Sequence, residues 1–129
     1  MAEGRLRLRR VGDDAVICED LVLGESFGQR FMGLMGRASL PEREGLYLPA
    51  NSIHMMFMRF PIDALFVSRE DESGHRSVVS LRPDLPAWRG IVLPVRGAQG
   101  VVEMPAGTLA RLEVAEGDTV VFERVGAGE

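Results

Sequence analysis

Apolar and polar residues alternate with a period of two along much of the chain, which is the pattern of half-buried β-strands. Near the N-terminus, arginine alternates with leucine over residues 5–11, and a second apolar run covers residues 15–23. The turn residues Gly12, Asp13 and Asp14 separate these two runs. Two strand-like runs joined by such a turn are typical of an antiparallel hairpin. The first strand carries Arg5, Arg7 and Arg9 on one face, which favours a solvated strand face over a basic binding patch.

Further strand-like runs are separated by turns that contain glycine and proline. They cover residues 45–48, 52–60, 64–68, 77–81, 90–93, 101–104 and 119–124. Two short helices are also expected, one over residues 26–37 with Ser26 as its cap and one over residues 105–112 that begins at Pro105. This order predicts an α+β, mostly β fold, in which a curled, largely antiparallel sheet forms a barrel or half-barrel.

The apolar face of each expected element identifies a candidate core. We expect one core to contain residues from both helices and from several strands. Its members are Leu34, Met35, Phe57, Phe66, Val102, Leu112 and Val121. Cys18 lies within an apolar strand pattern and is expected to be an inert, buried thiol. Trp88 lies in a proline-containing loop, where covering the edge of the core is favoured over contacting a ligand.

Length and composition agree with a single domain that has its own core. The chain has 129 residues, of which 46% are hydrophobic and 26% are charged. A domain of this size folds without a disulfide or a structural metal ion. We therefore expect one globular domain over residues 1–125 and a flexible tail over residues 126–129.

The residue counts exclude several chemistries. With the single cysteine Cys18, neither an intrachain disulfide nor a CxxC redox pair is possible. All the basic residues are arginine, which excludes a Schiff-base lysine and a phosphate-loop lysine. The two histidines are too few for a three-histidine zinc site. We expect no cofactor and no metal ion.

Charge and hydropathy also limit the partners. The net charge of −4 argues against a nucleic-acid partner, since nucleic-acid-binding domains usually carry a basic face. No apolar run reaches the length of a membrane span or of a secretory signal, so we expect a cytoplasmic protein without a membrane partner. The arginine-rich first strand discourages edge pairing, and we expect a monomer.

The segment over residues 52–63 has the most unusual composition. In a strand, His54, Met56 and Met58 would share one face, and imidazole with thioether sulfur suits Cu(I). Core packing of the methionines is the favoured interpretation. Alternatively, Asp63 could orient His54 for acid-base chemistry, if the bend at Pro61 brings the two side chains together.

Four motifs resemble those of one protein family. They are Gly33-Leu34-Met35-Gly36-Arg37, the run from Ile53-His54 through Met58 and Pro61-Ile62-Asp63 to Phe66, Val102-Glu103-Met104-Pro105-Ala106-Gly107, and Val114 followed by Gly117-Asp118. Together they resemble the domain of unknown function 192, an uncharacterised family of bacteria and archaea, over about residues 30–122. The resemblance implies a single domain with a curled, largely antiparallel sheet, and it implies no established reaction.

The motif residues that the resemblance carries over to this chain form the candidate site. They are Arg37, His54, Met58, Asp63 and Glu103. We expect Asp63 and Glu103 to accept backbone hydrogen bonds at the bend and at the second helix, and Arg37 to pair with one of them.

The expected function is that of a binding or accessory module with a polar groove at one end of the barrel. Its partner would be an unidentified small ligand or protein. An enzyme that uses His54 and Asp63, or a purely structural module, is the alternative. No set of nucleophile, base and orienting group is evident, which favours binding over catalysis.

Overall fold

The computed structural model describes residues 5–24, 40–55 and 58–126, and these residues are mostly β-strand. The N-terminal alternation of arginine and leucine forms β1 (Arg5–Arg10), which pairs antiparallel with β2 (Val16–Leu23), so the expected hairpin is confirmed. The remaining strands are β3 (Glu44–Leu48), β4 (Ile53–His54), β5 (Ile62–Val67), β6 (His75–Leu85), β7 (Ile91–Val92), β8 (Gly100–Pro105) and β9 (Thr119–Val125).

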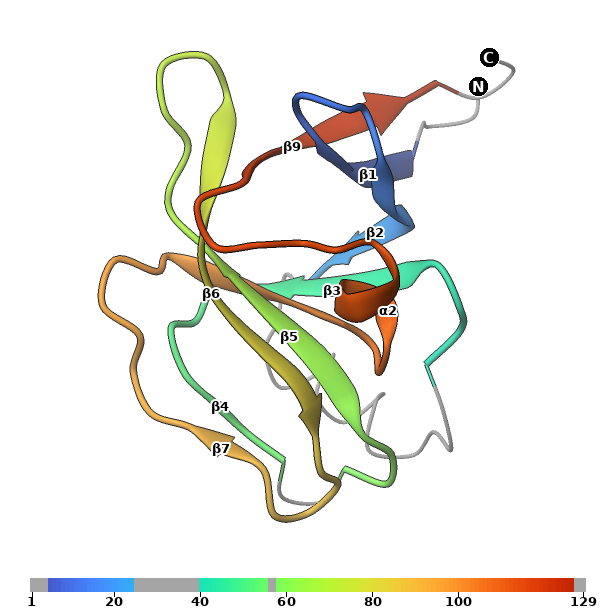
Figure 1. The fold of residues 1–129 in the computed structure, drawn as a ribbon, viewed down its shortest axis with the longest axis vertical. Helices are drawn as coiled ribbons and strands as arrows, with labels where there is room; N and C mark the ends of the chain where they lie inside the picture. The colour runs from blue at the N-terminus through green and yellow to red at the C-terminus, as the bar shows by residue number, and fades with distance from the viewer. Residues whose placement is uncertain (1–4, 25–39, 56–57, 127–129) are drawn as a thin grey trace.

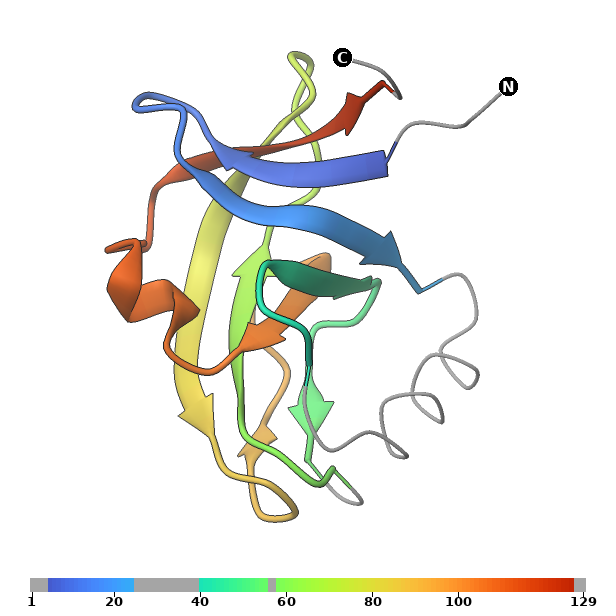
Figure 2. The ribbon, with the colours of Figure 1, turned by 90° about the vertical axis from the view of Figure 1, so that its right-hand side faces the viewer.

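Seven of these strands close into a barrel in the order β1-β2-β3-β8-β5-β6-β9 (Figures 1 and 2). The antiparallel pairing of β1 with β9 closes the barrel. Within the described part of the chain, β2 and β3 are parallel and the other paired strands are antiparallel, which confirms the largely antiparallel barrel. Along β1, Leu8 is fully buried while Arg7 and Arg9 both contact Glu123 of β9, as expected for a charged outer strand face.

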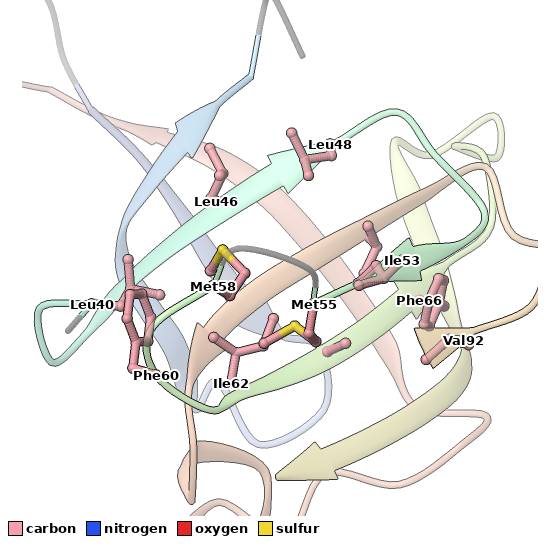
Figure 3. Close-up of a cluster of buried hydrophobic side chains, with 12 residues drawn as sticks. Leu40, Leu46, Leu48, Ile53, Met55, Met58, Phe60, Ile62, Phe66 and Val92 are labelled. Atoms are coloured by element: carbon pink, nitrogen blue, oxygen red, sulfur yellow. The ribbon is translucent and has the colours of Figure 1, made fainter. Parts of the chain in front are cut away.

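The other two strands, β4 and β7, form a small sheet outside the barrel. This small sheet covers one face of the barrel wall, because Ile53 of β4 and Val92 of β7 pack in the same cluster as Phe66 of β5 and Val101 of β8 (Figure 3). The neighbouring residues on these wall strands, such as Leu65 and Val102, belong to a second cluster with Leu8. β5 and β8 are therefore buried on both faces.

The structure thus has two apolar clusters where one core was expected. Phe66 belongs to the outer cluster and Val102 to the inner one, and Leu112 is partly buried against the inner cluster. Val121 was wrongly assigned to the core, since Val120 is the buried residue of this adjacent pair. The other expected core members, Leu34, Met35 and Phe57, lie outside the described residues.

One short helix, α2 (Thr108–Arg111), is present in the described residues, where two helices were expected in the chain. It is shorter than the predicted span of 105–112, because Gly107 adopts a left-handed φ of 96° as the N-cap. The other expected helix, over residues 26–37, falls outside the described ranges. No helix in the described ranges combines the length and the apolar character that crossing a membrane requires.

The strand expected over residues 52–60 is limited to the two residues of β4. After β4 the backbone turns, and the Met55 carbonyl accepts hydrogen bonds from the N–H of Met58 at 3.0 Å and the N–H of Trp88 at 2.9 Å. The Met55 N–H in turn donates to the Gly90 carbonyl at 2.7 Å. These bonds attach the segment to the loop before β7 and end the strand.

Candidate functional site

A cavity of about 280 Å³ lies beside the small β4–β7 sheet and reaches the outer face of the barrel wall. Its walls are mostly apolar, and its polar side chains come from β4, β8 and the loop before β4. The lining residues are Leu48, Ala50, Ser52, Ile53, His54, Ile91, Val92, Leu93, Pro94 and Glu103. We call this cavity the Glu103 pocket.

The position of Glu103 follows from the alternation of side chains along β8. Val102 and Met104 point into the inner cluster, so Glu103 points to the outer face of the barrel wall, as Val101 does. Its neighbours across the strands are Leu46 of β3 and Ala64 of β5, which are both apolar and buried. Glu103 is only 6% exposed, and no described residue donates a hydrogen bond to its carboxyl group.

Burial raises the pKa of Glu103 from its ordinary value of 4.5 to about 7. The cause is desolvation, because removing a carboxylate from water disfavours its charged form. Near neutral pH, the carboxyl group is therefore present in both forms. The protonated form offers a hydrogen-bond donor to the pocket, and the ionised form offers only acceptors.

His54 lines the same pocket from β4, where it pairs with Ile91 of β7. Its side chain lies at the surface, while the neighbouring Ile53 is buried in the outer cluster. The structure thus brings together two of the predicted site residues, the imidazole of His54 and the carboxyl of Glu103, in one largely apolar cavity.

Asp63 has a structural environment of a different kind. Its side chain is fully buried, and its carboxylate accepts backbone hydrogen bonds from Asp84 at 2.8 Å, Gly107 at 3.1 Å and Leu109 at 2.9 Å. The prediction that Asp63 accepts backbone donors at the second helix is confirmed. For Glu103 it stays a prediction, since none of the backbone hydrogen bonds between described residues involves its carboxyl group. Asp63 does not line the Glu103 pocket, so the structure gives this pocket no His54–Asp63 pair.

The remaining predicted site residues do not line the pocket. Met58 is 2% exposed and packs in the outer apolar cluster, as the core interpretation of the methionines predicts for this residue. Arg37, and Met56 of the copper hypothesis, lie outside the described residues. Over the described ranges, the His, Cys, Asp and Glu side chains form no group of three that could hold a metal ion.

Cys18 is buried, as predicted, on the strand β2 of the barrel. Burial raises the pKa of its thiol to about 12, so the thiol stays protonated and unreactive at neutral pH. Trp88, by contrast, is 55% exposed, so more than half of this residue remains open to solvent.

The sequence did not identify the apolar walls of the pocket. Ile91, Val92, Leu93 and Pro94 form an uninterrupted apolar run, which resembles an ordinary buried strand. Only Val92 of this run is buried, whereas Ile91 and Leu93 are exposed at the pocket. A signal was nevertheless present, because exposed strand positions usually carry polar residues and this run carries none.

Comparisons with known proteins support the fold and the family. Among solved structures, a protein of unknown function from Novosphingobium aromaticivorans has a TM-score of 0.66 at 23% identity, covering 90% of this chain and 82% of that one. A Sinorhizobium meliloti protein, named as a proposed transcription regulator, has a TM-score of 0.65 at 24% identity, covering 99% of this chain and 96% of that one. These similarities show a shared fold.

The sequence comparisons extend to archaea. A UPF0127 protein of Thermococcus kodakarensis is 36% identical over 103 residues, which cover 76% of this chain and 61% of that relative. The chain therefore matches about three fifths of the length of this relative. Residues 11–122 match the family described as Uncharacterized ACR, domain of unknown function 192. This match covers most of the chain, and the chain belongs to the domain of unknown function 192 family.

Proposed function

We propose that this chain is a binding module whose Glu103 pocket takes a small, mostly apolar ligand with one hydrogen-bond donor. The observation that carries the proposal is the Glu103 carboxyl, which is 6% exposed and receives no hydrogen bond from the described residues. Among the described residues, the enclosed side-chain atom that lacks a hydrogen-bond partner is Arg76 Nε, so the Glu103 oxygens are open to the pocket. A carboxyl group at such a site usually has water or a ligand as its hydrogen-bond partner. A donor group on a ligand would supply that partner.

The size and walls of the pocket define the apolar part of the ligand. Its volume of about 280 Å³ is near the lower end of the range for small-molecule sites. Leu48, Ile53 and Val92 supply buried apolar surface, and Ile91 and Leu93 supply exposed apolar surface. A short hydrocarbon group would therefore be desolvated by the walls, with its polar end directed to Glu103.

The charge of Glu103 also determines which polar group on the ligand the pocket prefers. Above pH 7 its carboxylate favours an ammonium or a hydroxyl group, since both can donate a hydrogen bond. A carboxylate ligand would be repelled under the same conditions. His54 places a second polar side chain at the pocket.

The test uses three probes with the same hydrocarbon chain: n-hexylamine, n-hexanol and hexanoate. Binding at pH 8 is followed by amide chemical-shift changes in nuclear magnetic resonance spectra. We expect saturable binding of the amine and the alcohol, with the changes centred on Ile53, His54 and Val92, and no binding of hexanoate. The amine should bind more tightly than the alcohol, because its ammonium group pairs with the Glu103 carboxylate.

The variants show whether Glu103 makes the selection. Glu103→Gln keeps the shape of the side chain and removes its charge, so the preference for the amine over the alcohol should disappear. Glu116→Gln changes an exposed carboxylate elsewhere and should respond to each of the three probes as the unchanged chain does. An equal response to all three probes, or the same amine preference in Glu103→Gln, would contradict the proposal.

A further inference from the structure

Three large apolar residues lie exposed within one short segment of the chain. Trp88 is 55% exposed, Ile91 66% and Leu93 72%. They belong to the loop after β6 and to β7 with the residue that follows it. This part of the fold lies at the end of the molecule away from the two termini (Figure 1). Ile91 and Leu93 line the same hollow, and exposed apolar residues that lie together are typical of an interaction surface.

The charge around this cluster differs in sign from the charge of the whole chain. Residues 85–102 include Arg89 and Arg96 and contain no acidic residue. Arg82 and Arg96 also line a shallow hollow together with Ile91 and Leu93. The acidic residues that flank this segment are Asp84 and the buried Glu103, whereas the whole chain has a net charge of −4. The exposed apolar side chains of Ile91 and Leu93 therefore lie beside two arginines.

The loop that presents Trp88 is held by backbone hydrogen bonds. The Trp88 N–H donates to the Met55 carbonyl at 2.9 Å, and the Gly90 N–H donates to the Pro86 carbonyl at 3.0 Å. Trp88 itself has a φ of 67°, a left-handed conformation that is unfavourable for a bulky residue. The surrounding bonds stabilise this conformation and fix the exposed position of the residue.

We propose that this surface docks on an anionic membrane. We call it the apolar-arginine face, formed by Trp88, Ile91 and Leu93 with Arg82, Arg89 and Arg96. Tryptophan and aliphatic side chains bury in the interfacial region of a bilayer, and nearby arginines contact anionic headgroups.

The small number of residues in this face favours a membrane over a protein partner. A stable protein interface covers about 800 Å² on each partner, contributed by some 20–30 residues. Insertion into a bilayer interface requires only a few apolar side chains with cationic neighbours. The sequence-based expectation of no membrane partner depended on the lack of a spanning segment, and interfacial docking needs no such segment.

Trp88 provides a direct reporter, because it is the single tryptophan of the chain. The full chain is titrated with vesicles of phosphatidylcholine alone and with vesicles that also contain phosphatidylglycerol. We expect a blue shift of tryptophan emission and co-sedimentation with the anionic vesicles only. Added salt should reduce both signals, because it screens the arginines.

Variants separate the cationic from the apolar contribution. Arg89→Gln and Arg96→Gln should each weaken partitioning about fivefold, and Leu93→Ser should weaken it about tenfold or more. The matched controls are Arg69→Gln, in the exposed loop between β5 and β6, and Leu23→Ser, at another exposed apolar position. Both should partition as the unchanged chain does.

Two results would overturn the proposal. One is the lack of an emission shift with anionic vesicles, and the other is a shift with poly-glutamate but not with lipid, which would indicate an acidic protein partner. Ile91 and Leu93 line the Glu103 pocket as well as this face, whereas Arg89 does not line the pocket. The amine and alcohol titrations are therefore repeated with Arg89→Gln, which should bind vesicles more weakly and bind both probes as the unchanged chain does, so that the two proposals fail separately.

Discussion

The Asp63 carboxylate on β5 accepts a hydrogen bond of 2.9 Å from the backbone N–H of Leu109, in the first turn of α2. The same carboxylate accepts a bond from Gly107, the N-cap residue of this helix, and another from Asp84 of β6. Asp63 thereby satisfies backbone donors of two elements that are distant in sequence. A helix of four residues has little stability of its own, so we infer that this side chain positions it against the barrel.

The first prediction is that Asp63→Ala destabilises the domain by about 3–5 kcal/mol. The substitution leaves three backbone donors without their acceptor, and each unsatisfied donor costs about 1–3 kcal/mol. The free energy of unfolding is measured by urea denaturation. Asp20→Ala, at an exposed position of β2, is the control and should change stability by less than about 0.5 kcal/mol. Equal losses in the two variants would show that the buried carboxylate has no special role.

The second prediction concerns the pH dependence of stability that Glu103 causes. Its pKa is raised from 4.5 to about 7 in the folded chain, so between these pH values the folded state binds more protons than the unfolded state. The contribution of Glu103 is therefore most favourable below pH 4.5, decreases as the pH rises to 7, and is constant above that. The total decrease is about 3 kcal/mol.

Glu103→Gln should lack this part of the pH dependence, because an amide does not titrate in this range. The difference in unfolding free energy between the variant and the unchanged chain should shift by about 3 kcal/mol in favour of the variant from pH 4.5 to pH 7.5. Glu116→Gln, an exposed control, should follow the unchanged chain throughout. If the unfolding free energies of Glu103→Gln and of the unchanged chain change with pH in parallel, Glu103 does not titrate near pH 7.

The sequence predicted the barrel well where one face of a strand is polar. Over residues 5–9 of β1, arginine and leucine alternate, which identifies both the strand and its buried side. In β9 the sequence does not show which of two neighbouring residues faces the core, because Val120 and Val121 are both apolar. Val120 is the buried one, and Phe122, two residues further on, packs on the same cluster.

The candidate site could be predicted only in part, because its burial depends on contacts between distant segments. The motif that contains Glu103 was recognised from the sequence. The raised pKa of Glu103, however, results from burial beside Ile53 and Val92, which come from other segments of the chain. The short length of β4 likewise depends on hydrogen bonds from Trp88 and to Gly90. Local patterns do not report such long-range contacts. The family resemblance, rather than the local pattern, implied that Asp63 accepts backbone hydrogen bonds at the second helix.

The third prediction is that His54→Ala destabilises the domain by less than about 1 kcal/mol. His54 is exposed and belongs to a strand of two residues, so its removal leaves the two apolar clusters intact. Urea denaturation of this variant is compared directly with that of Asp63→Ala. A loss for His54→Ala that exceeds the loss for Asp63→Ala would make the histidine a structural residue and the aspartate dispensable.

The last prediction concerns Gly100 at the start of β8. A Cβ atom at this position would overlap the ring and the hydroxyl of Tyr47. That ring packs edge-on against Phe122 with the centroids 5.0 Å apart, and the guanidinium of Arg76 lies 5.4 Å from the centre of the Tyr47 ring and 4.6 Å from that of Phe122. Because neighbours surround the ring, it has little room to move away, and Gly100→Ala should cost about 1–3 kcal/mol.

A double-mutant cycle with Tyr47→Ala identifies the cause of this loss. If the ring is the obstacle, removing it relieves the overlap, and Gly100→Ala should cost clearly less in the Tyr47→Ala background than alone. The unfolding free energies of both single variants and of the double variant are measured under the same conditions. Strict additivity would instead mean that alanine at position 100 acts on the backbone of β8, and that the packing of Tyr47 does not require glycine there.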